Sequence, residues 1–303
     1  MLEIIKAIIY GIVEGITEWL PISSTGHLIL VERLIPFQQT SEGFFDMFDV
    51  VIQLGAILAV VVLFWNKIWP FYLKKNQQTK KGGIVRSRKD FTVGNVALSM
   101  DAFWMWVKIV VACIPAVVYG LLFDDAVSEA FKKEIGGSGV TIQVIVVAVM
   151  LVLVGVLFIV IENWNKNRVP ATTKLSQLTY RDALIIGLCQ LAAAALPGTS
   201  RSGATILGAI VIGISRTVAA EFTFFLAIPV MFGASLLKVV KFGFAYTGME
   251  LACLLVGTIV SFIVSLFVLR FLMEYIKKHD FKVFGWYRIV LGIVVLLYFL
   301  VFV

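Results

Sequence analysis

The stretch that decides the fold is IIYGIVEGITEWLPISSTGH, residues 8–27. Its apolar helical pattern is broken at Pro21, because proline removes a backbone donor and clashes with the preceding turn. Polar groups gather around the break: Glu14 and Glu18 precede it, and His27, one of the chain's two histidines, follows it. Ionisable groups at membrane depth cost roughly 2.5–3.5 kcal/mol each, so they are usually kept for function. This stretch is therefore half of a candidate functional site.

The whole chain has the composition of a membrane protein. Its 303 residues are 60% hydrophobic and 15% charged, and the mean hydropathy is +0.97. Soluble globular domains carry about 25% charged residues, so this composition indicates a polytopic membrane protein in contact with membrane lipids. The net charge of +7 falls mainly in loops between apolar runs, where membrane topology explains it. We therefore expect no nucleic-acid partner.

Six apolar runs are long enough to cross a bilayer, which takes about 20 helical residues. They are residues 48–69, 102–123, 140–161, 219–238, 251–270 and 286–303. Shorter apolar pieces, interrupted by proline and small polar residues, form two broken hairpins. Their arms are residues 2–20 and 26–35 in the first hairpin, and 183–196 and 202–214 in the second. The expected fold is an all-α polytopic membrane protein with six transmembrane helices and two re-entrant helical hairpins.

Loop charge orients these segments, because cytoplasmic loops are rich in lysine and arginine. The loop 67–90 is strongly basic and the loop 124–134 is mainly acidic, which predicts that they lie inside and outside the cell, respectively. The two hairpins then enter the membrane from opposite sides, as in an inverted-topology repeat. We expect a single integral membrane domain, 1–303. It consists of repeat one at about 1–161, a basic cytoplasmic loop at 162–182, and repeat two at about 182–303.

The two breaks resemble each other in sequence. Gly11 and Gly187 each lie ten residues before the proline of a Leu-Pro pair, and each proline is followed by a hydroxyl-rich turn that ends in glycine. Inverted repeats with discontinuous helices place polar groups from both halves near the bilayer midplane. We therefore expect the turns at 21–27 and 197–203 to share one cavity.

The first turn has a pattern that suits phosphate. Ser23, Ser24, Thr25 and Gly26 supply hydroxyls and free amides at the start of a new helix, and helix N-termini bind anions. His27 falls in the first helical turn, where it could act on the Ser24 hydroxyl or on a phosphoryl oxygen as a general acid or base. The alternative is a serine-capped helix with a histidine that is hydrogen-bonded in the core.

Glu14 and Glu18 share one helix face, because they are four residues apart. Like charges at that spacing repel each other, so the pair requires a cation, an arginine or a shared proton. Oxygen ligands favour Mg²⁺ or Ca²⁺, whereas zinc would require more histidine or cysteine than this chain offers. A structural pair buried against lysines is the alternative.

The second turn carries Thr199, Ser200, Arg201, Ser202 and Gly203. An arginine fork donates two parallel hydrogen bonds to phosphate oxygens, and glycine lets backbone amides approach an anion closely. We expect this turn to bind a phosphoryl group. In the alternative, the arginine only neutralises one of the two glutamates. The two roles are compatible, and a glutamate should be the nearest acid to the arginine when no substrate is bound.

Together these motifs resemble the undecaprenyl-diphosphatase family, the bacitracin-resistance proteins of bacterial plasma membranes. The residues that carry the resemblance are Glu14-Gly15-x-x-Glu18-x-x-Pro21-x-Ser23-Ser24-Thr25-Gly26-His27 and Pro197-Gly198-Thr199-Ser200-Arg201-Ser202-Gly203-Ala204-Thr205. The similarity covers the whole chain and includes Phe48-Asp49-Val50-Val51-Ile52-Gln53-Leu54-Gly55.

The resemblance implies an enzyme that hydrolyses undecaprenyl diphosphate to undecaprenyl phosphate and inorganic phosphate at the outer face of the plasma (inner) membrane. Such an enzyme recycles the lipid carrier of peptidoglycan synthesis, confers bacitracin resistance and depends on a divalent cation. The implied catalytic residues are Glu14, Glu18, Ser24, His27 and Arg201, of which Glu14 and Glu18 would bind the metal. The implied substrate-binding residues are Ser23, Thr25, Gly26, Thr199, Ser200, Ser202 and Gly203. Ser24 would attack with help from His27, and attack by water is the alternative.

Two other functions fit this sequence less well. A transporter or flippase of polyprenyl phosphates would explain an inverted repeat, but it has no special need for Ser24 and His27 in attack geometry. Membrane phosphatases of the type-2 phosphatidic-acid kind carry a catalytic histidine six residues after their arginine, whereas Leu207 occupies that position here. The sequence leaves assembly as a homodimer open.

Overall fold

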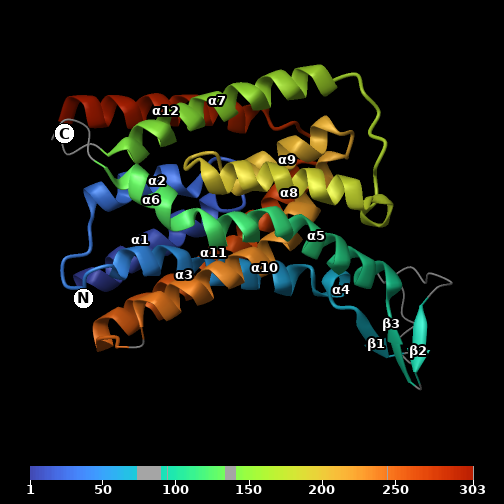
Figure 1. Cartoon of the computed structure of the whole chain (residues 1–303), viewed down its shortest axis with the longest axis horizontal. Helices are drawn as coiled ribbons and strands as arrows, with labels where there is room; N and C mark the ends of the chain where they lie inside the picture. The colour runs from blue at the N-terminus through green and yellow to red at the C-terminus, as the bar shows by residue number, and fades with distance from the viewer. Residues whose placement is uncertain (74–89, 94, 134–140, 244, 303) are drawn as a thin grey trace.

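The computed structural model describes residues 1–73, 90–93, 95–133, 141–243 and 245–302, and helices dominate it (Figure 1). Among the described residues, six helices are long and apolar enough to cross a membrane. They are α3 (Phe44–Leu63), α5 (Met100–Leu122), α7 (Ile142–Asn165), α10 (Arg216–Phe242), α11 (Gly248–Tyr275) and α12 (Lys282–Phe302). Each overlaps one of the six predicted spans, so the predicted helical polytopic membrane protein is confirmed.

Two shorter helical hairpins lie among the long helices. They are formed by α1 (Leu2–Thr17) with α2 (Ser24–Leu34), and by α8 (Tyr180–Ala195) with α9 (Arg201–Val211). The first helix of each pair ends close to a Leu-Pro sequence: α1 ends three residues before Leu20, and α8 ends directly before Leu196. The residue before a proline disfavours the helical conformation, so neither helix continues through the pair. In Figure 1, α1 and α2 open toward the end of the molecule where the N-terminus lies, whereas α8 and α9 open toward the end where the strands lie.

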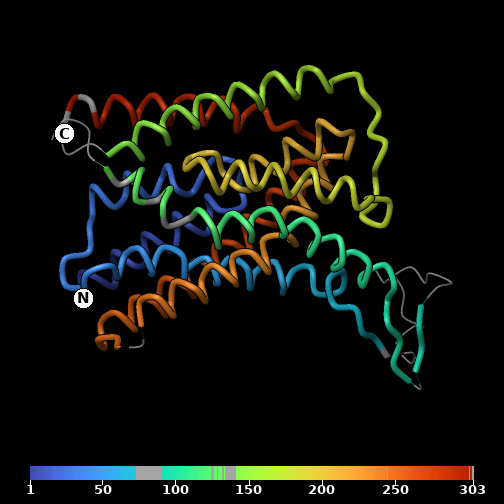
Figure 2. The backbone as a smooth tube through the Cα atoms, viewed as in Figure 1, coloured from blue at the N-terminus to red at the C-terminus, as the bar shows by residue number. Residues whose placement is uncertain are grey.

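Glycines allow α7 and α12 to pack closely. A Cβ built on Gly155 would lie 2.7 Å from the carbonyl oxygen of Gly285, and a Cβ built on Gly285 would lie 2.7 Å from the carbonyl oxygen of Gly155. Small residues at such crossings let membrane helices approach each other. Figure 2 shows the two helices running side by side. This contact fixes α12, which carries two residues of the site described below.

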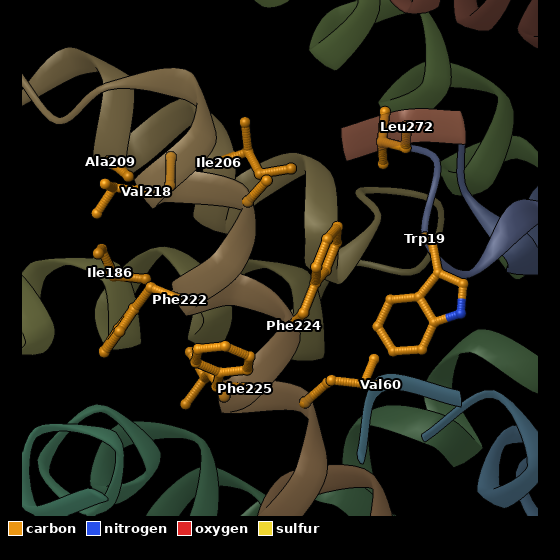
Figure 3. Close-up of a cluster of buried hydrophobic side chains, with 14 of the residues drawn as sticks. Trp19, Val60, Ile186, Ile206, Ala209, Val218, Phe222, Phe224, Phe225 and Leu272 are labelled. Carbon is orange, nitrogen blue, oxygen red and sulfur yellow. The ribbon is translucent and has the colours of Figure 1, made fainter. Parts of the chain in front are cut away.

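The main hydrophobic core lies between the first hairpin turn and α10. Trp19 is fully buried and packs edge-on against Phe224, with ring centroids 5.2 Å apart and an angle of 83° between the ring planes. Figure 3 shows this pair together with Val60 and Leu272. Edge-to-face packing contributes about 0.5–1.5 kcal/mol beyond area burial. Because Trp19 directly follows Glu18 in the chain, the core holds the start of the turn in place.

A small antiparallel sheet between α3 and α5 was not predicted. Its strands, in the order β1-β3-β2, are β1 (Phe71–Leu73), β2 (Phe91–Val93) and β3 (Val96–Leu98). Strands of three residues are too short to give a recognisable alternation in sequence. The remaining described elements are the short helices α4 (Trp65–Ile68), α6 (Asp124–Lys132) and η2 (Leu175–Gln177). The basic residues at 74–89 and the acidic Glu134, which contributed to the predicted orientation, lie outside the described residues.

Candidate active site

The two hairpin turns meet in space. Nη2 of Arg201, at the start of α9, lies 2.7 Å from Oε1 of Glu18, at the end of α1. Ser202 Oγ donates a further hydrogen bond of 3.2 Å to the backbone carbonyl of Glu18. The side chains of Arg201 and Glu18 are only 15% and 8% exposed. The glutamate–arginine pair that the sequence predicted is therefore present, and it is largely shielded from solvent.

Both turns have the same unusual backbone. Ser23 has a φ of +74° and Ser200 a φ of +69°, and no other described residue except glycine has a positive φ. A non-glycine residue in such a region costs of order 1–3 kcal/mol and is found mainly at functional sites. Each serine also caps the helix that follows, because its Oγ accepts a hydrogen bond from the amide of Gly26 (3.4 Å) or Gly203 (3.2 Å). The two turns are therefore built alike.

Arg288 of α12 joins the two turns. Its side chain is fully buried. Nη1 donates to the carbonyl oxygen of Pro21 (3.2 Å), and Nη2 donates to those of Gly198 (2.8 Å) and Thr199 (3.0 Å). A broken helix leaves such carbonyls without helical partners, and burying them unpaired would be costly. The sequence prediction missed Arg288. The signal that could have found it is that no other charged residue occurs between positions 283 and 303.

The hydroxyl of Ser24 contacts Glu18. Ser24 Oγ donates to Glu18 Oε2 across 3.1 Å, while Oε1 of the same carboxylate accepts from Arg201. One carboxylate therefore bridges the serine of the first turn and the arginine of the second. The sequence predicts that His27 assists Ser24. In this structure Glu18 is the group in position to accept the serine proton.

His27 has a partner at each ring nitrogen. Nδ1 lies 2.8 Å from the carbonyl oxygen of Ser23, and Nε2 lies 2.7 Å from the hydroxyl oxygen of Tyr287 on α12. The two rings are stacked, with centroids 5.6 Å apart and an angle of 8° between their planes. The sequence prediction also missed Tyr287, because tyrosine is common near the ends of membrane spans and no motif marks it. The catalytic role of His27 stays a prediction.

Glu14 is buried without a partner. Its carboxylate has no exposed surface, and neither oxygen has a hydrogen-bond partner among the described residues. A buried carboxylate without a partner is costly, so Glu14 marks a place for a cation, a proton or water. No group of three or more His, Cys, Asp or Glu side chains in the described part of the chain is arranged to hold a metal. A cation on Glu14 and Glu18 would therefore need oxygens from water or substrate as well.

Asp49 and Gln190 are two further polar residues with unpaired buried atoms, and neither was among the predicted site residues. Within the described chain, Oδ1 of Asp49 on α3 has no partner, and the same is true of Oε1 and Nε2 of Gln190 on α8. Gln190 lies seven residues before Pro197, the same spacing that separates Glu14 from Pro21. Equivalent positions of the two hairpins therefore both carry a buried polar side chain.

The remaining predicted binding residues lie in the turns or at the helix ends beside them. Thr25 is in the first turn of α2. Thr199 Oγ1 donates to the carbonyl oxygen of Leu196 across 2.7 Å, and the hydroxyl oxygens of Ser200 and Ser202 are 3.2 Å apart. Both α2 and α9 begin at these turns, so two helix N-termini, which attract anions, start next to the ion pair. The arrangement suits a phosphorylated ligand.

Comparison with known proteins agrees with this chemistry. The sequence profile of the family described as Bacitracin resistance protein BacA matches residues 7–294. An undecaprenyl-diphosphatase of Desulfitobacterium hafniense is 56% identical over 99% of this chain and 97% of its own length. An undecaprenyl-diphosphatase of Enterococcus faecalis is 54% identical over 98% of this chain and 97% of its own length. One of Acetivibrio thermocellus is 54% identical over 99% of each chain.

Proposed function

This chain belongs to the bacitracin resistance protein family BacA, and we propose that it hydrolyses undecaprenyl diphosphate to undecaprenyl phosphate and inorganic phosphate. The observation that carries this proposal is the meeting of Ser24, Glu18 and Arg201 beside two helix N-termini. These groups supply a nucleophile, a proton acceptor and a cation that stabilises a phosphoryl group. A lipid substrate agrees with the six apolar helices of the described chain.

We place both hairpins inside the bilayer as re-entrant segments. The helices α2 and α9 have 11 residues each, about 16 Å of helix, which is roughly half of a 30 Å hydrocarbon core. Their turns would meet near the midplane from opposite sides, and the opposite openings of the hairpins in Figure 1 support this placement. The matching backbones of Ser23 and Ser200 support an inverted repeat with units at about 1–161 and 182–303.

The proposed location is the bacterial plasma membrane. Basic loops favour the cytoplasm, so the end of the molecule that carries the sheet would lie inside and the end that carries the N-terminus would lie outside. The first hairpin then opens at the outer face, where the enzyme would return the lipid carrier of cell-wall synthesis to use. Assembly as a homodimer stays a prediction.

In the proposed reaction, Arg201 and the amides at the start of α9 bind the terminal phosphoryl group. Ser24 Oγ forms a bond to its phosphorus, while Glu18 accepts the hydroxyl proton. The bond between that phosphorus and the bridging oxygen breaks, and undecaprenyl phosphate leaves. Water then hydrolyses the phosphoserine, which releases inorganic phosphate and restores the serine hydroxyl. Direct attack by water is the alternative, and acid quenching during turnover separates the two because only the first gives phosphorylated Ser24.

The acidic residues also suit a divalent cation. Mg²⁺ is usually held by one or two carboxylates together with substrate phosphates, and Ca²⁺ also takes oxygen ligands. Glu14 has two buried oxygens without partners in the described chain, and Glu18 lies one turn further along the same face. We propose that these two residues hold the ion, which would neutralise charge on the diphosphate when bound.

The test of this function is phosphate release from undecaprenyl diphosphate by the purified full chain in lipid vesicles. We expect release with Mg²⁺ or Ca²⁺, and a loss of at least about 100-fold in Arg201→Met, because a positioned cation that stabilises developing charge is removed. Arg270→Met is a suitable control, since it makes the same replacement at an exposed position of α11. No release with either ion, or full activity in Arg201→Met, would contradict the proposal.

The opposed hairpins also favour a second function, the movement of polyprenyl phosphates across the membrane. Inverted repeats with broken helices are typical of secondary transporters. Accumulation of a labelled polyprenyl phosphate in the inner leaflet of vesicles that contain the protein would support this function. A Ser24→Ala variant that moves lipid but releases no phosphate would show that the two activities are separate, whereas equal movement in protein-free vesicles would exclude transport.

A further inference from the structure

We propose that Tyr287 is a positioning residue for the hydrolysis: its hydroxyl donates to Nε2 of His27 and holds the ring where Nδ1 supports the strained turn at Ser23. This inference rests on the proposed phosphatase function. It assigns a role to a side chain that carries no recognised motif and that belongs to the last helix of the chain, far in sequence from both hairpins. Tyr287 acts through His27 and does not need to touch the substrate.

The hydrogen bonds of His27 define its tautomer. Nδ1 lies 2.8 Å from the carbonyl oxygen of Ser23. A carbonyl oxygen can only accept, so Nδ1 carries the proton. In a neutral imidazole the other nitrogen is then an acceptor, so the Tyr287 hydroxyl donates to Nε2 across 2.7 Å. The Ser23 carbonyl thereby sets the tautomer, and the Tyr287 hydroxyl, which can donate or accept, stabilises it by donating to Nε2.

This tautomer supports the turn next to the candidate nucleophile. The φ of +74° at Ser23 is held only if surrounding contacts over-determine it. One such contact is the hydrogen bond from His27 Nδ1 to the Ser23 carbonyl, and another is the bond from the Gly26 amide to Ser23 Oγ. Ser24 follows directly, with its Oγ on Glu18. If the proton moved to Nε2, Nδ1 and the carbonyl would face each other as two acceptors and the turn would lose this support.

Two adjacent residues of α12 act on the same turn. Arg288 donates to the carbonyl of Pro21 and to two carbonyls of the second turn. Tyr287 reaches the other side of the first turn through the ring of His27. The close Gly155–Gly285 contact fixes the helix that carries both residues. Through these two residues, α12 supports the first turn.

The second histidine provides an internal comparison. Nδ1 of His279 also faces a backbone carbonyl, that of Tyr275 at 3.2 Å, and its ring also stacks on a tyrosine. In the described chain, however, no hydroxyl faces its Nε2. The protein has only these two histidines, so a sample labelled with ¹⁵N-histidine gives two sets of ring signals, and His279→Gln assigns them.

The test compares the full chain with Tyr287→Phe, which keeps the stacked ring and removes the hydroxyl. In lipid bilayers, ¹⁵N spectra distinguish protonated from unprotonated ring nitrogens. We expect a protonated Nδ1 and a hydrogen-bonded Nε2 at His27 in the native chain, a shift of the Nε2 signal in Tyr287→Phe, and no change at His279. The kcat for phosphate release should fall about 10-fold, which corresponds to ~1.4 kcal/mol for one lost hydrogen bond, and KM should stay within about twofold.

Three results would overturn the inference. The first is a native chain in which His27 is protonated at Nε2, a measurement that requires no variant. The second is a Tyr287→Phe variant whose His27 ring ¹⁵N signals are unchanged, whatever its activity. The third is a rise in KM without a fall in kcat, which would make Tyr287 a substrate contact. If the native chain releases no phosphate, the proposed function fails while the comparison of the His27 ring ¹⁵N signals still gives its own answer. Tyr298→Phe, on the same helix about three turns away, is the control variant.

Discussion

Oε1 of Glu18 accepts a hydrogen bond of 2.7 Å from Arg201, although 183 residues separate the two in the chain. The other oxygen of the same carboxylate accepts from Ser24. Glu18 therefore links the candidate nucleophile of the first turn to the candidate phosphate clamp of the second. Nη1 of Arg201 has no hydrogen-bond partner in the described chain, so a phosphoryl group can bind there while Nη2 keeps its contact with Glu18.

Replacing the candidate nucleophile should stop turnover but leave the lipid site intact. We expect Ser24→Ala to lower phosphate release by at least about 100-fold, because a positioned catalytic group is lost. Binding of undecaprenyl diphosphate, measured by retention of the labelled lipid on the purified protein, should stay unchanged. Turnover close to that of the native chain would remove Ser24 from the mechanism.

The two acids should control the metal requirement. Glu14→Gln and Glu18→Gln each remove one ligand charge, so we expect a higher Mg²⁺ or Ca²⁺ concentration for half-maximal activity in each variant. The measurement is a metal titration of phosphate release after removal of bound ions with a chelator. Asp101→Asn, on a different helix, is the control. An unchanged titration with reduced activity would remove the glutamates from the metal site and leave them roles in proton transfer or positioning only.

Removing the residue that joins the two turns should cost both stability and activity. Arg288→Met keeps much of the side-chain volume but leaves three buried carbonyls without their donor, and each unpaired buried group costs about 1–3 kcal/mol. We expect a clearly lower Tm and a loss of phosphate release. Arg270→Met, at an exposed position of α11, should leave both close to native. Equal Tm values for the two variants would show that the Arg288 contacts contribute little.

The proposed orientation can be checked with single cysteines. The three native cysteines, Cys113, Cys189 and Cys253, are free thiols and can be replaced by alanine. In that background, a cysteine at Gln39, which follows the first hairpin, should react with an impermeant thiol reagent on intact cells. A cysteine at Ala171, in the loop before α8, should react only after lysis. The opposite labelling pattern would reverse the topology.

Much of the fold could be read from the sequence because the bilayer sets strict lengths. A span needs about 20 apolar residues, and six such runs became six long helices. Pro21 and Pro197 interrupt two other apolar runs, and the helices end four and two residues before them, respectively. The sheet was missed, since its three-residue strands are too short to show a period.

The candidate site was partly readable for a related reason. Charged residues are expensive inside an apolar run, so Glu14, Glu18 and Arg201 stand out in the sequence, and the structure brings the last two into contact. The contacts of Ser24 did not follow from its spacing to His27. Both residues lie in one helical turn, and the rotation of that turn against α1 puts the hydroxyl on Glu18.

The roles of α12 were decided by packing between distant segments. Sequence spacing cannot show that Arg288 reaches Pro21 across 267 residues, or that Tyr287 meets His27 across 260. These contacts exist because small residues let α12 lie close against α7, which sets the height and rotation of its side chains over the turns. Hydrophobic length and helix-breaking residues are local properties, so the sequence specifies the membrane spans and the breaks. The partner of each polar group depends on how helices far apart in the chain pack together, so it appears only in the folded molecule.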